Sequence, residues 1–184
     1  TDLLEHPEKA EGANNIVIVG GGVVGCETAH WLANEYGKNV TVLEMLPHFM
    51  MGVCTANRGH LLHYLEKSGV RLYNCTKVKA LAKDGVYVEQ NQSQTVPDPY
   101  NTWQPLLPPN IPNPMEKAIK EEIVEKKIPA DLIVLAMGGK ADETFFFEAG
   151  EEHLAKEIYN IGDSSRAGRV LEAVRGAYHL AVRI

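Results

Sequence analysis

Apolar residues occur along this chain in two patterns, continuous runs and helical spacing. Residues 16–19 are a continuous apolar run of Val and Ile, which is typical of a parallel strand that is buried on both faces, and residues 39–44 predict a second buried strand that ends in an acid. Residues 23–36 have the spacing of a helix, and Gly37 follows as a C-terminal cap. Strand, helix and strand within about 30 residues predict one right-handed crossover unit.

The following elements extend this pattern. Apolar residues at helical spacing in 55–68 predict a second helix, and the run 70–75 predicts a third strand. Residues 77–89 alternate around Asp84-Gly85, a dipeptide typical of hairpin turns, and therefore predict an antiparallel β-hairpin.

The segment after the hairpin has a different composition. Residues 97–114 contain seven prolines, a density that neither a helix nor a central strand tolerates. We expect a long surface loop there, with Trp103 as its anchor. Residues 115–127 are so rich in Glu and Lys that they predict a solvated helix or a frayed arm. Residues 97–128 are therefore expected to be a proline-rich loop and a charged arm.

Regular elements return at the end of the chain. Residues 131–137 predict another buried strand, which ends at Gly138 and Gly139. A last short strand is expected at 157–161, and apolar residues at helical spacing predict a last helix at 169–184. Because the chain begins with Thr1 and ends within that helix, we expect a fragment of a longer polypeptide.

Composition and charge narrow the class of partner. The formal net charge is −6 and there is no block of basic residues, which argues against nucleic acid or an anionic membrane surface. No apolar run approaches the ~20 residues that a membrane span needs. No signal-peptide pattern stands at the start, so we expect a cytoplasmic protein with no membrane partner.

Cysteine and histidine give no strong sign of redox or metal chemistry. Cys26, Cys54 and Cys75 form no CxxC pair, so neither a redox-active disulfide nor an iron–sulfur cluster is expected, and we expect three reduced, buried thiols. His60 and His63 share a face of a predicted helix. No further ligand completes the set, so no metal site is expected.

The strongest motif is Gly20-x-Gly22-x-x-Gly25, between a predicted strand and a predicted helix. The first glycine permits a tight turn, the second lets a pyrophosphate approach the backbone, and the third lets helix and strand pack closely. Amides at the start of the helix then favour an anion. The predicted cofactor-binding stretch consists of Gly20, Gly21, Gly22, Val23, Val24 and Gly25.

Glu44 ends the next strand, 19 residues beyond Gly25. A carboxylate at this position accepts hydrogen bonds from an adenosine ribose and repels a 2′-phosphate. Residues 45–48 contain no arginine that would bind such a phosphate. The sequence therefore favours NAD(H) over NADP(H).

Three stretches together resemble a known family. VIVGGGVVGCETA followed by VTVLE, then ADLIVLAMGG, then EIYNIGDSSRAGRVLEAVRGAYHLA occur in the expected order. They resemble the two-dinucleotide-binding flavoproteins that include the pyridine nucleotide–disulfide oxidoreductases. The last stretch is most similar to the C-terminal part of NADH:flavin oxidoreductases related to 2-enoate reductase, 2,4-dienoyl-CoA reductase and trimethylamine dehydrogenase. The resemblance covers residues 14–96 and 129–184.

This resemblance implies a fold and a domain organisation. The fold class is α/β, a Rossmann-like parallel sheet with an antiparallel β-hairpin crossover, present as a fragment. Residues 1–14 are expected to be a lead-in or linker, residues 15–137 an NAD(H)-binding domain, and residues 138–184 the C-terminal part of an FAD-binding domain.

The resemblance also implies roles for single residues. Glu27 matches an acid near the nicotinamide, although a first-turn helix acid is an equal alternative. Gly138 and Gly139 match crossover glycines near the cofactor. Gly162 and Asp163 match the pair that binds the flavin ribityl chain, and an acid that closes a turn is the alternative for Asp163.

The function implied is that of a segment of an NADH-dependent flavin oxidoreductase. Hydride would pass from NADH to FAD, and electrons would go on to an enoate- or dienoyl-type acceptor. The resemblance implies that FMN and an iron–sulfur cluster belong to an upstream barrel, and this chain has no cluster cysteines. Because only one GxGxxG is present, the glycine loop for the ADP half of FAD is also expected upstream. No catalytic acid, base or nucleophile is identified, and the fragment is expected to be inactive alone.

Two alternatives stay open at this point. One is a non-catalytic dinucleotide-binding or redox-sensing module, and the other is a fragment of a disulfide reductase or NADH oxidase. If the chain is instead a segment of a flavin oxidoreductase, its expected partners are NADH and the remainder of the parent flavoenzyme. The apolar run Phe145-Phe146-Phe147 would pack on that remainder or form a homodimer.

Overall fold

The computed structural model describes residues 2–103, 107, 110–111, 113–114 and 117–184. The chain divides into two compact units, Thr1–Met137 and Gly138–Ile184. The first unit contains all the strands found in the described residues, and the second contains helices and irregular segments.

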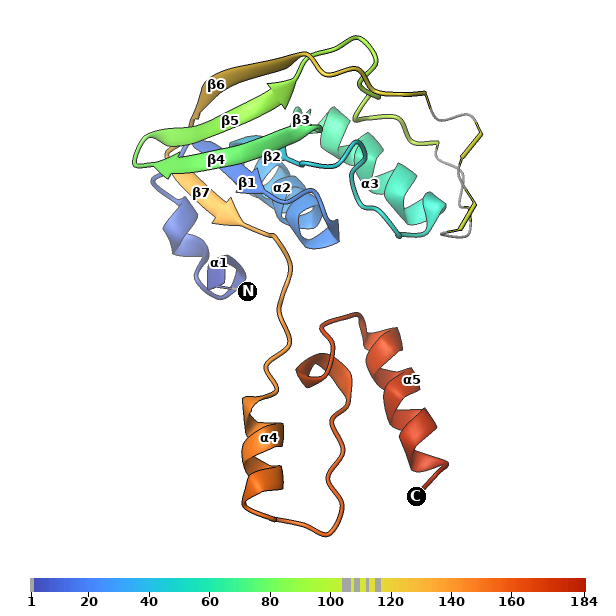
Figure 1. The fold of residues 1–184 in the computed structure, drawn as a ribbon. Helices are drawn as coiled ribbons and strands as arrows, with labels where there is room; N and C mark the ends of the chain where they lie inside the picture. The colour runs from blue at the N-terminus through green and yellow to red at the C-terminus, as the bar shows by residue number, and fades with distance from the viewer. Residues whose placement is uncertain (1, 104–106, 108–109, 112, 115–116) are drawn as a thin grey trace. The chain divides into compact units, whose positions relative to one another are not determined.

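A parallel sheet forms the centre of the first unit (Figure 1). Its strand order is β3-β2-β1-β7, and every neighbouring pair is parallel. The strands are β1 (Asn15–Val19), β2 (Asn39–Leu43), β3 (Arg71–Tyr73) and β7 (Leu132–Leu135). The helices that connect the first three strands are α2 (Val23–Tyr36) and α3 (Thr55–Lys67). The expected α/β class with a Rossmann-like sheet is confirmed.

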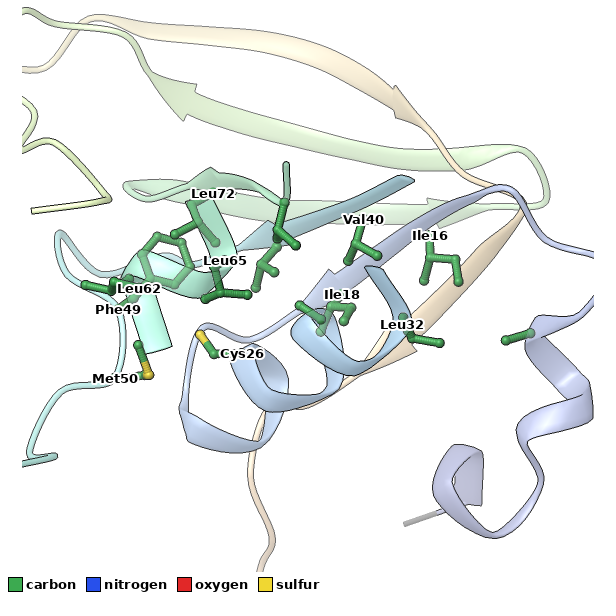
Figure 2. Close-up of a cluster of buried hydrophobic side chains, with 14 of the residues drawn as sticks. Ile16, Ile18, Cys26, Leu32, Val40, Phe49, Met50, Leu62, Leu65 and Leu72 are labelled. Carbon is green, nitrogen blue, oxygen red and sulfur yellow. The ribbon is translucent and has the colours of Figure 1, made fainter. Parts of the chain in front are cut away.

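Strands β1 and β2 are covered on both faces, which explains their apolar residues. The expectation of a buried strand at 131–137 was wrong, because β7 is half-buried and Leu135 is 57% exposed. Ile16 and Ile18 belong to a buried cluster with side chains of α2 and α3 (Figure 2). Val17 and Val19, which point to the opposite face, pack with residues of a second, antiparallel sheet. Because adjacent residues of a strand point in opposite directions, each residue from Ile16 to Val19 faces one of these two clusters and is apolar.

The antiparallel sheet has the order β4-β5-β6. Its strands are β4 (Thr76–Ala82), β5 (Gly85–Asn91) and β6 (Ile123–Pro129). The predicted hairpin is confirmed as β4 and β5. The expectation of a charged helix or frayed arm up to residue 127 was wrong at its end, because β6 pairs with β5 from residue 123 onward.

Period-two alternation accounts for the charged strand β6. Ile128 is buried, and two residues before it Lys126 lies with its ammonium 4.4 Å from the centre of the Tyr73 ring. Glu125 and Lys127, on the other face, are exposed. Because a cation over an aromatic ring is favourable, Lys126 can lie on the same face of β6 as the buried Ile128.

The lead-in contains two short helices, and the described start of the proline-rich segment, residues 97–103, is held by hydrogen bonds. Residues 1–14 contain α1 (Asp2–Glu5) and the 3₁₀ helix η1 (Pro7–Ala10), and Ala10 is fully buried. Trp103 is not the anchor of the proline-rich loop, since 61% of it is exposed. The anchor is Tyr100, whose hydroxyl donates to the Val70 carbonyl at 2.5 Å and accepts the Leu72 N–H at 3.2 Å.

The second unit contains α4 (Thr144–Glu151), the 3₁₀ helix η2 (Gly162–Ser164) and α5 (Val170–Ala181). The prediction of a strand at 157–161 was wrong. In the described part of the chain, no strand pairs with this segment. Ala149 is the one buried hydrophobic residue found among the described residues of this unit, and Phe145 is 76% exposed. No helix in the described part of the chain is long and apolar enough to cross a membrane.

The cysteines differ from one another in burial. All three are free, as expected. Cys26 is buried, but Cys54 is exposed at the N-cap of α3 and Cys75 is half-buried. The expectation of three buried thiols therefore holds for Cys26 alone.

Candidate functional site

The turn between β1 and α2 requires glycine at two positions because of close backbone contacts. Gly20 has φ +114°, and a Cβ there would overlap the carbonyl of Ala136 at the end of β7. A Cβ on Gly25 would overlap the carbonyl oxygen of Gly20. Glycine at these two positions therefore lets the turn, the helix and β7 approach one another closely.

Gly22 differs, because no atom lies within 4 Å of the position that its Cβ would take. It is the N-cap of α2, and it has no side chain to accept an amide of the first turn. The amides of Val23, Val24 and Gly25 have no acceptor inside the helix by helix geometry. An open glycine beside free amides and the positive end of a helix is a suitable site for a pyrophosphate.

Glu44 lies immediately after β2, where its half-buried carboxylate is held on both oxygens. Oε2 accepts the Gly21 N–H at 2.8 Å, and Oε1 accepts the Leu46 N–H at 2.8 Å. Each carboxylate oxygen can accept a further hydrogen bond. The acid is thus oriented against the glycine turn and keeps capacity for hydroxyl donors such as those of a ribose.

Buried side chains of the segment 44–54 pack against Gly21 of the glycine turn. A Cβ on Gly21 would overlap the ring of Phe49 and would lie 2.8 Å from Cβ of Glu44. The Gly21 carbonyl accepts the Met50 N–H at 2.8 Å. Phe49 and Met50 belong to the same buried cluster as Cys26 (Figure 2). The segment 44–54 therefore shapes the glycine turn, which sequence reasoning missed because it has no periodic pattern.

Cys26 begins the buried part of α2, and its Sγ donates to the Gly21 carbonyl at 3.6 Å. Burial, with a smaller contribution from the charge of Glu44, raises the pKa of its thiol to about 12, although the guanidinium of Arg58 acts in the opposite direction. A thiol of this pKa is neutral at physiological pH and is a poor nucleophile. Cys26 is therefore a structural residue of the turn.

The second unit contains the other predicted site residues. Gly162 opens η2 with φ +69°, and Oδ1 of Asp163 accepts the Gly168 N–H at 3.2 Å. A cavity of about 700 Å³ lies here, lined among others by Gly162, Arg166 and Arg169. Asp163 is thus bonded within the loop before α5 and is next in sequence to Gly162, which lines the cavity, and both roles predicted for it stay predictions.

Residues 1–161 match the sequence profile of the family described as pyridine nucleotide-disulphide oxidoreductase. The chain belongs to this family.

Relatives of this pyridine nucleotide-disulphide oxidoreductase chain are much longer than it is. An NADH oxidase of Thermoanaerobacter brockii is 26% identical over the whole chain, which spans 23% of that protein. A cinnamate reductase of Clostridium sporogenes is 22% identical over 96% of the chain, which spans 22% of that protein. In a solved complex of 2-naphthoyl-CoA reductase, the whole chain aligns with 23% of the protein at 25% identity and a TM-score of 0.72.

The remaining predicted site residues of this family member are exposed. Glu27 lies on the solvent side of α2, and Gly138 and Gly139 are also exposed. Gly138 has φ +90° and no atom within 4 Å of its Cβ position. Neither of the two roles predicted for Glu27, as an acid near the nicotinamide or as a first-turn helix acid, is tested by this geometry, and both remain predictions.

The paired histidines of α3 form an aromatic cluster. His60 and His63 lie with ring centres 4.6 and 5.8 Å from that of Tyr64, and His30 of α2 lies 5.7 Å from it. Within the described residues, no group of three or more His, Cys, Asp or Glu side chains is placed to hold a metal ion. Edge-to-face ring packing between α2 and α3 is the role that the geometry supports.

Proposed function

We propose that this chain is the NADH-binding segment of a flavin-dependent oxidoreductase, and that its second unit supplies part of the FAD site. The observation that carries the proposal is the pairing of open Gly22 at the start of α2 with the Glu44 carboxylate, which is bound to the amide of Gly21. These groups fit the two parts of a dinucleotide that all such cofactors share, the pyrophosphate and the adenosine ribose.

NADH is favoured over NADPH by the charge of Glu44. Its carboxylate accepts two backbone N–H groups and is positioned for ribose hydroxyls. A 2′-phosphate at the same place would meet a negative charge without a cation, since residues 45–48 contain neither Arg nor Lys. Both the attraction and the repulsion favour the cofactor that lacks the phosphate.

When bound, NADH supplies a hydride that FAD accepts. The contribution of this chain is placement: amides of α2 would hold the pyrophosphate, and Glu44 would orient the ribose. In the second unit, Gly162 and Asp163 would hold the flavin ribityl chain beside the cavity before α5. Glu27 is a proposed neighbour of the nicotinamide, and Gly138 and Gly139 are proposed to be crossover glycines near a cofactor.

The acceptor is proposed to be an unsaturated or aromatic acid or its thioester. This class is suggested by the relatives named cinnamate reductase and 2-naphthoyl-CoA reductase. The relative named NADH oxidase favours dioxygen as the second candidate. FMN, an iron–sulfur cluster and the acceptor site would then belong to the remainder of the parent enzyme, which would also cover exposed apolar residues such as Phe145 and Phe147.

Calorimetric titration of the purified chain with NADH, NADPH and FAD, each separately, tests the proposal. We expect NADH to bind more tightly than NADPH, and Glu44→Ala to weaken NADH about tenfold or more because hydrogen bonds to a charged group are lost. Circular dichroism of both proteins controls for folding. If the folded chain binds neither nicotinamide cofactor, the proposal fails.

A further inference from the structure

Arg58 is a buried arginine whose charge is met by backbone carbonyls. It lies in the first turns of α3 and is 3% exposed. Nε donates to the Phe49 carbonyl at 2.9 Å, and Nη1 donates to the carbonyls of Asn101 at 3.0 Å and Thr102 at 3.5 Å. Among the described residues no carboxylate forms an ion pair with it. Burial of a guanidinium in this way is costly.

The three carbonyls belong to two segments that lack regular structure. Phe49 lies in the loop 44–54, and Asn101 and Thr102 lie in the ordered start of the proline-rich loop, residues 97–103, which we name the strap. A planar guanidinium presents donors in fixed directions and can bond both segments at once, whereas a lysine ammonium is a single point. Arg58 thus bridges the loop 44–54 and the strap through Phe49, while Asn74 joins the same two segments at Pro47 and Pro97.

The strap itself is fixed independently of Arg58. Tyr100 bonds the backbone at the edge of β3, and Nδ2 of Asn74 donates to the carbonyls of Pro97 at 2.8 Å and of Pro47 at 2.7 Å. A Cβ on Gly59 would lie 3.4 Å from Cβ of Thr102, so the strap also packs closely on α3. It can therefore act as a fixed support from which Arg58 holds Phe49.

From Phe49 the contacts lead directly to the glycine turn. The Phe49 ring fills the space beside Gly21, and the next residue, Met50, donates its N–H to the Gly21 carbonyl. Met50 has φ +53°, an unfavourable conformation for a residue other than glycine. The tie from Arg58 to the adjacent carbonyl is positioned to maintain it. The N–H of Gly21 in turn holds Glu44.

We propose that Arg58 is a positioning residue of the dinucleotide site, which holds Phe49 against Gly21 and so sets the place of the Gly21 amide and the Glu44 carboxylate. This inference rests on the proposed function for its effect on NADH, but its effect on Gly21 is a property of the chain alone. Arg58 touches no cofactor and acts through the loop 44–54.

The experiment compares Arg58→Met with Asp131→Ala in the isotopically labelled chain. Methionine keeps an unbranched apolar stem and removes the donors. Asp131 accepts the N–H groups of Asn14 and Asn15 at the opposite end of β1, so its loss is a control for destabilisation away from the turn. Two quantities are measured, hydrogen exchange of the Gly21 amide and the dissociation constant of NADH.

We expect Arg58→Met to speed exchange of the Gly21 amide and to raise the NADH dissociation constant about tenfold, while Asp131→Ala changes neither beyond about twofold. Equal effects of the two variants on both quantities would reduce Arg58 to a general stabilising role and overturn the proposal. If Arg58→Met does not fold, Arg58→Lys replaces it, since lysine keeps the charge but lacks the separate Nε and Nη1 donors of the planar guanidinium. If wild type binds no NADH, the proposed function fails, and exchange of Gly21 still decides the role of Arg58.

Discussion

The carboxylate of Glu44 accepts the backbone N–H of Gly21 at 2.8 Å, so the acid at the end of β2 is bound to the glycine turn at the end of β1. Parallel pairing of Val19 with Leu43 brings the two strand ends to the same edge of the sheet. The group that would recognise the ribose and the turn that would recognise the pyrophosphate are therefore parts of one hydrogen-bonded unit.

Glu44→Gln is expected to change cofactor preference. The amide keeps one acceptor oxygen but removes the negative charge and leaves one of the two backbone N–H groups without its partner. We expect NADH to bind more weakly and the ratio of NADPH to NADH affinity to rise about tenfold. Titration calorimetry with both cofactors measures this ratio. Glu35→Gln, at the exposed C-terminal end of α2, is the matched control, and an equal shift in that variant would contradict the assignment of Glu44.

Gly22→Ala is expected to lower binding without lowering stability. No atom lies within 4 Å of the new Cβ, and the φ of −70° suits alanine. The methyl group would instead stand where a pyrophosphate approaches the helix amides. We expect an unchanged melting temperature and an NADH affinity lowered about tenfold or more. An unchanged affinity in the folded variant would show that phosphate does not bind there.

Gly21→Ala is expected to lower stability, because its Cβ would overlap the ring of Phe49. Overpacking of a buried site costs typically about 1–3 kcal/mol of stability. Urea unfolding of Gly21→Ala, Phe49→Leu and the double variant measures the coupling. A smaller ring-free side chain relieves the overlap, so the double variant should lose less than the sum of the single losses. Strict additivity would mean that Phe49 does not contact the turn.

The elements that come before and after the glycine turn could be predicted from local pattern alone. Ile16 to Val19 face two covered surfaces in alternation, so all of them must be apolar. The bounds of α2 follow from Gly22 and Gly37, since Gly37 adopts the left-handed conformation with φ 61° at the helix end. These features depend on residues that are close in sequence, so the local sequence pattern is enough to predict them.

Features that depend on distant contacts could not be predicted in this way. Arginine is usually a surface residue, and the burial of Arg58 depends on the backbone carbonyls of residues 49, 101 and 102. Tyr100 anchors the strap in place of Trp103 because its hydroxyl bonds two backbone groups at an open sheet edge. The size of an aromatic residue does not reveal which one makes such bonds. Strand β6 was hidden by its charges because one of them lies over the ring of Tyr73.

The pH dependence of stability is expected to report the burial of Cys26. Its pKa is raised from 9.0 to about 12, chiefly by burial. Above pH 9.0 the unfolded chain releases this proton while the folded chain keeps it, so the unfolded state binds fewer protons and stability falls as pH rises. This contribution is fully present below 9.0 and is lost progressively up to about 12 at roughly 1.4 kcal/mol per pH unit. Urea unfolding of wild type and Cys26→Ala at pH 8, 9 and 10 measures it. Tyr100, whose pKa is also raised by burial, contributes to both proteins alike, so the difference in slope isolates Cys26. Parallel slopes in the two proteins would show that the thiol under the glycine turn is open to water.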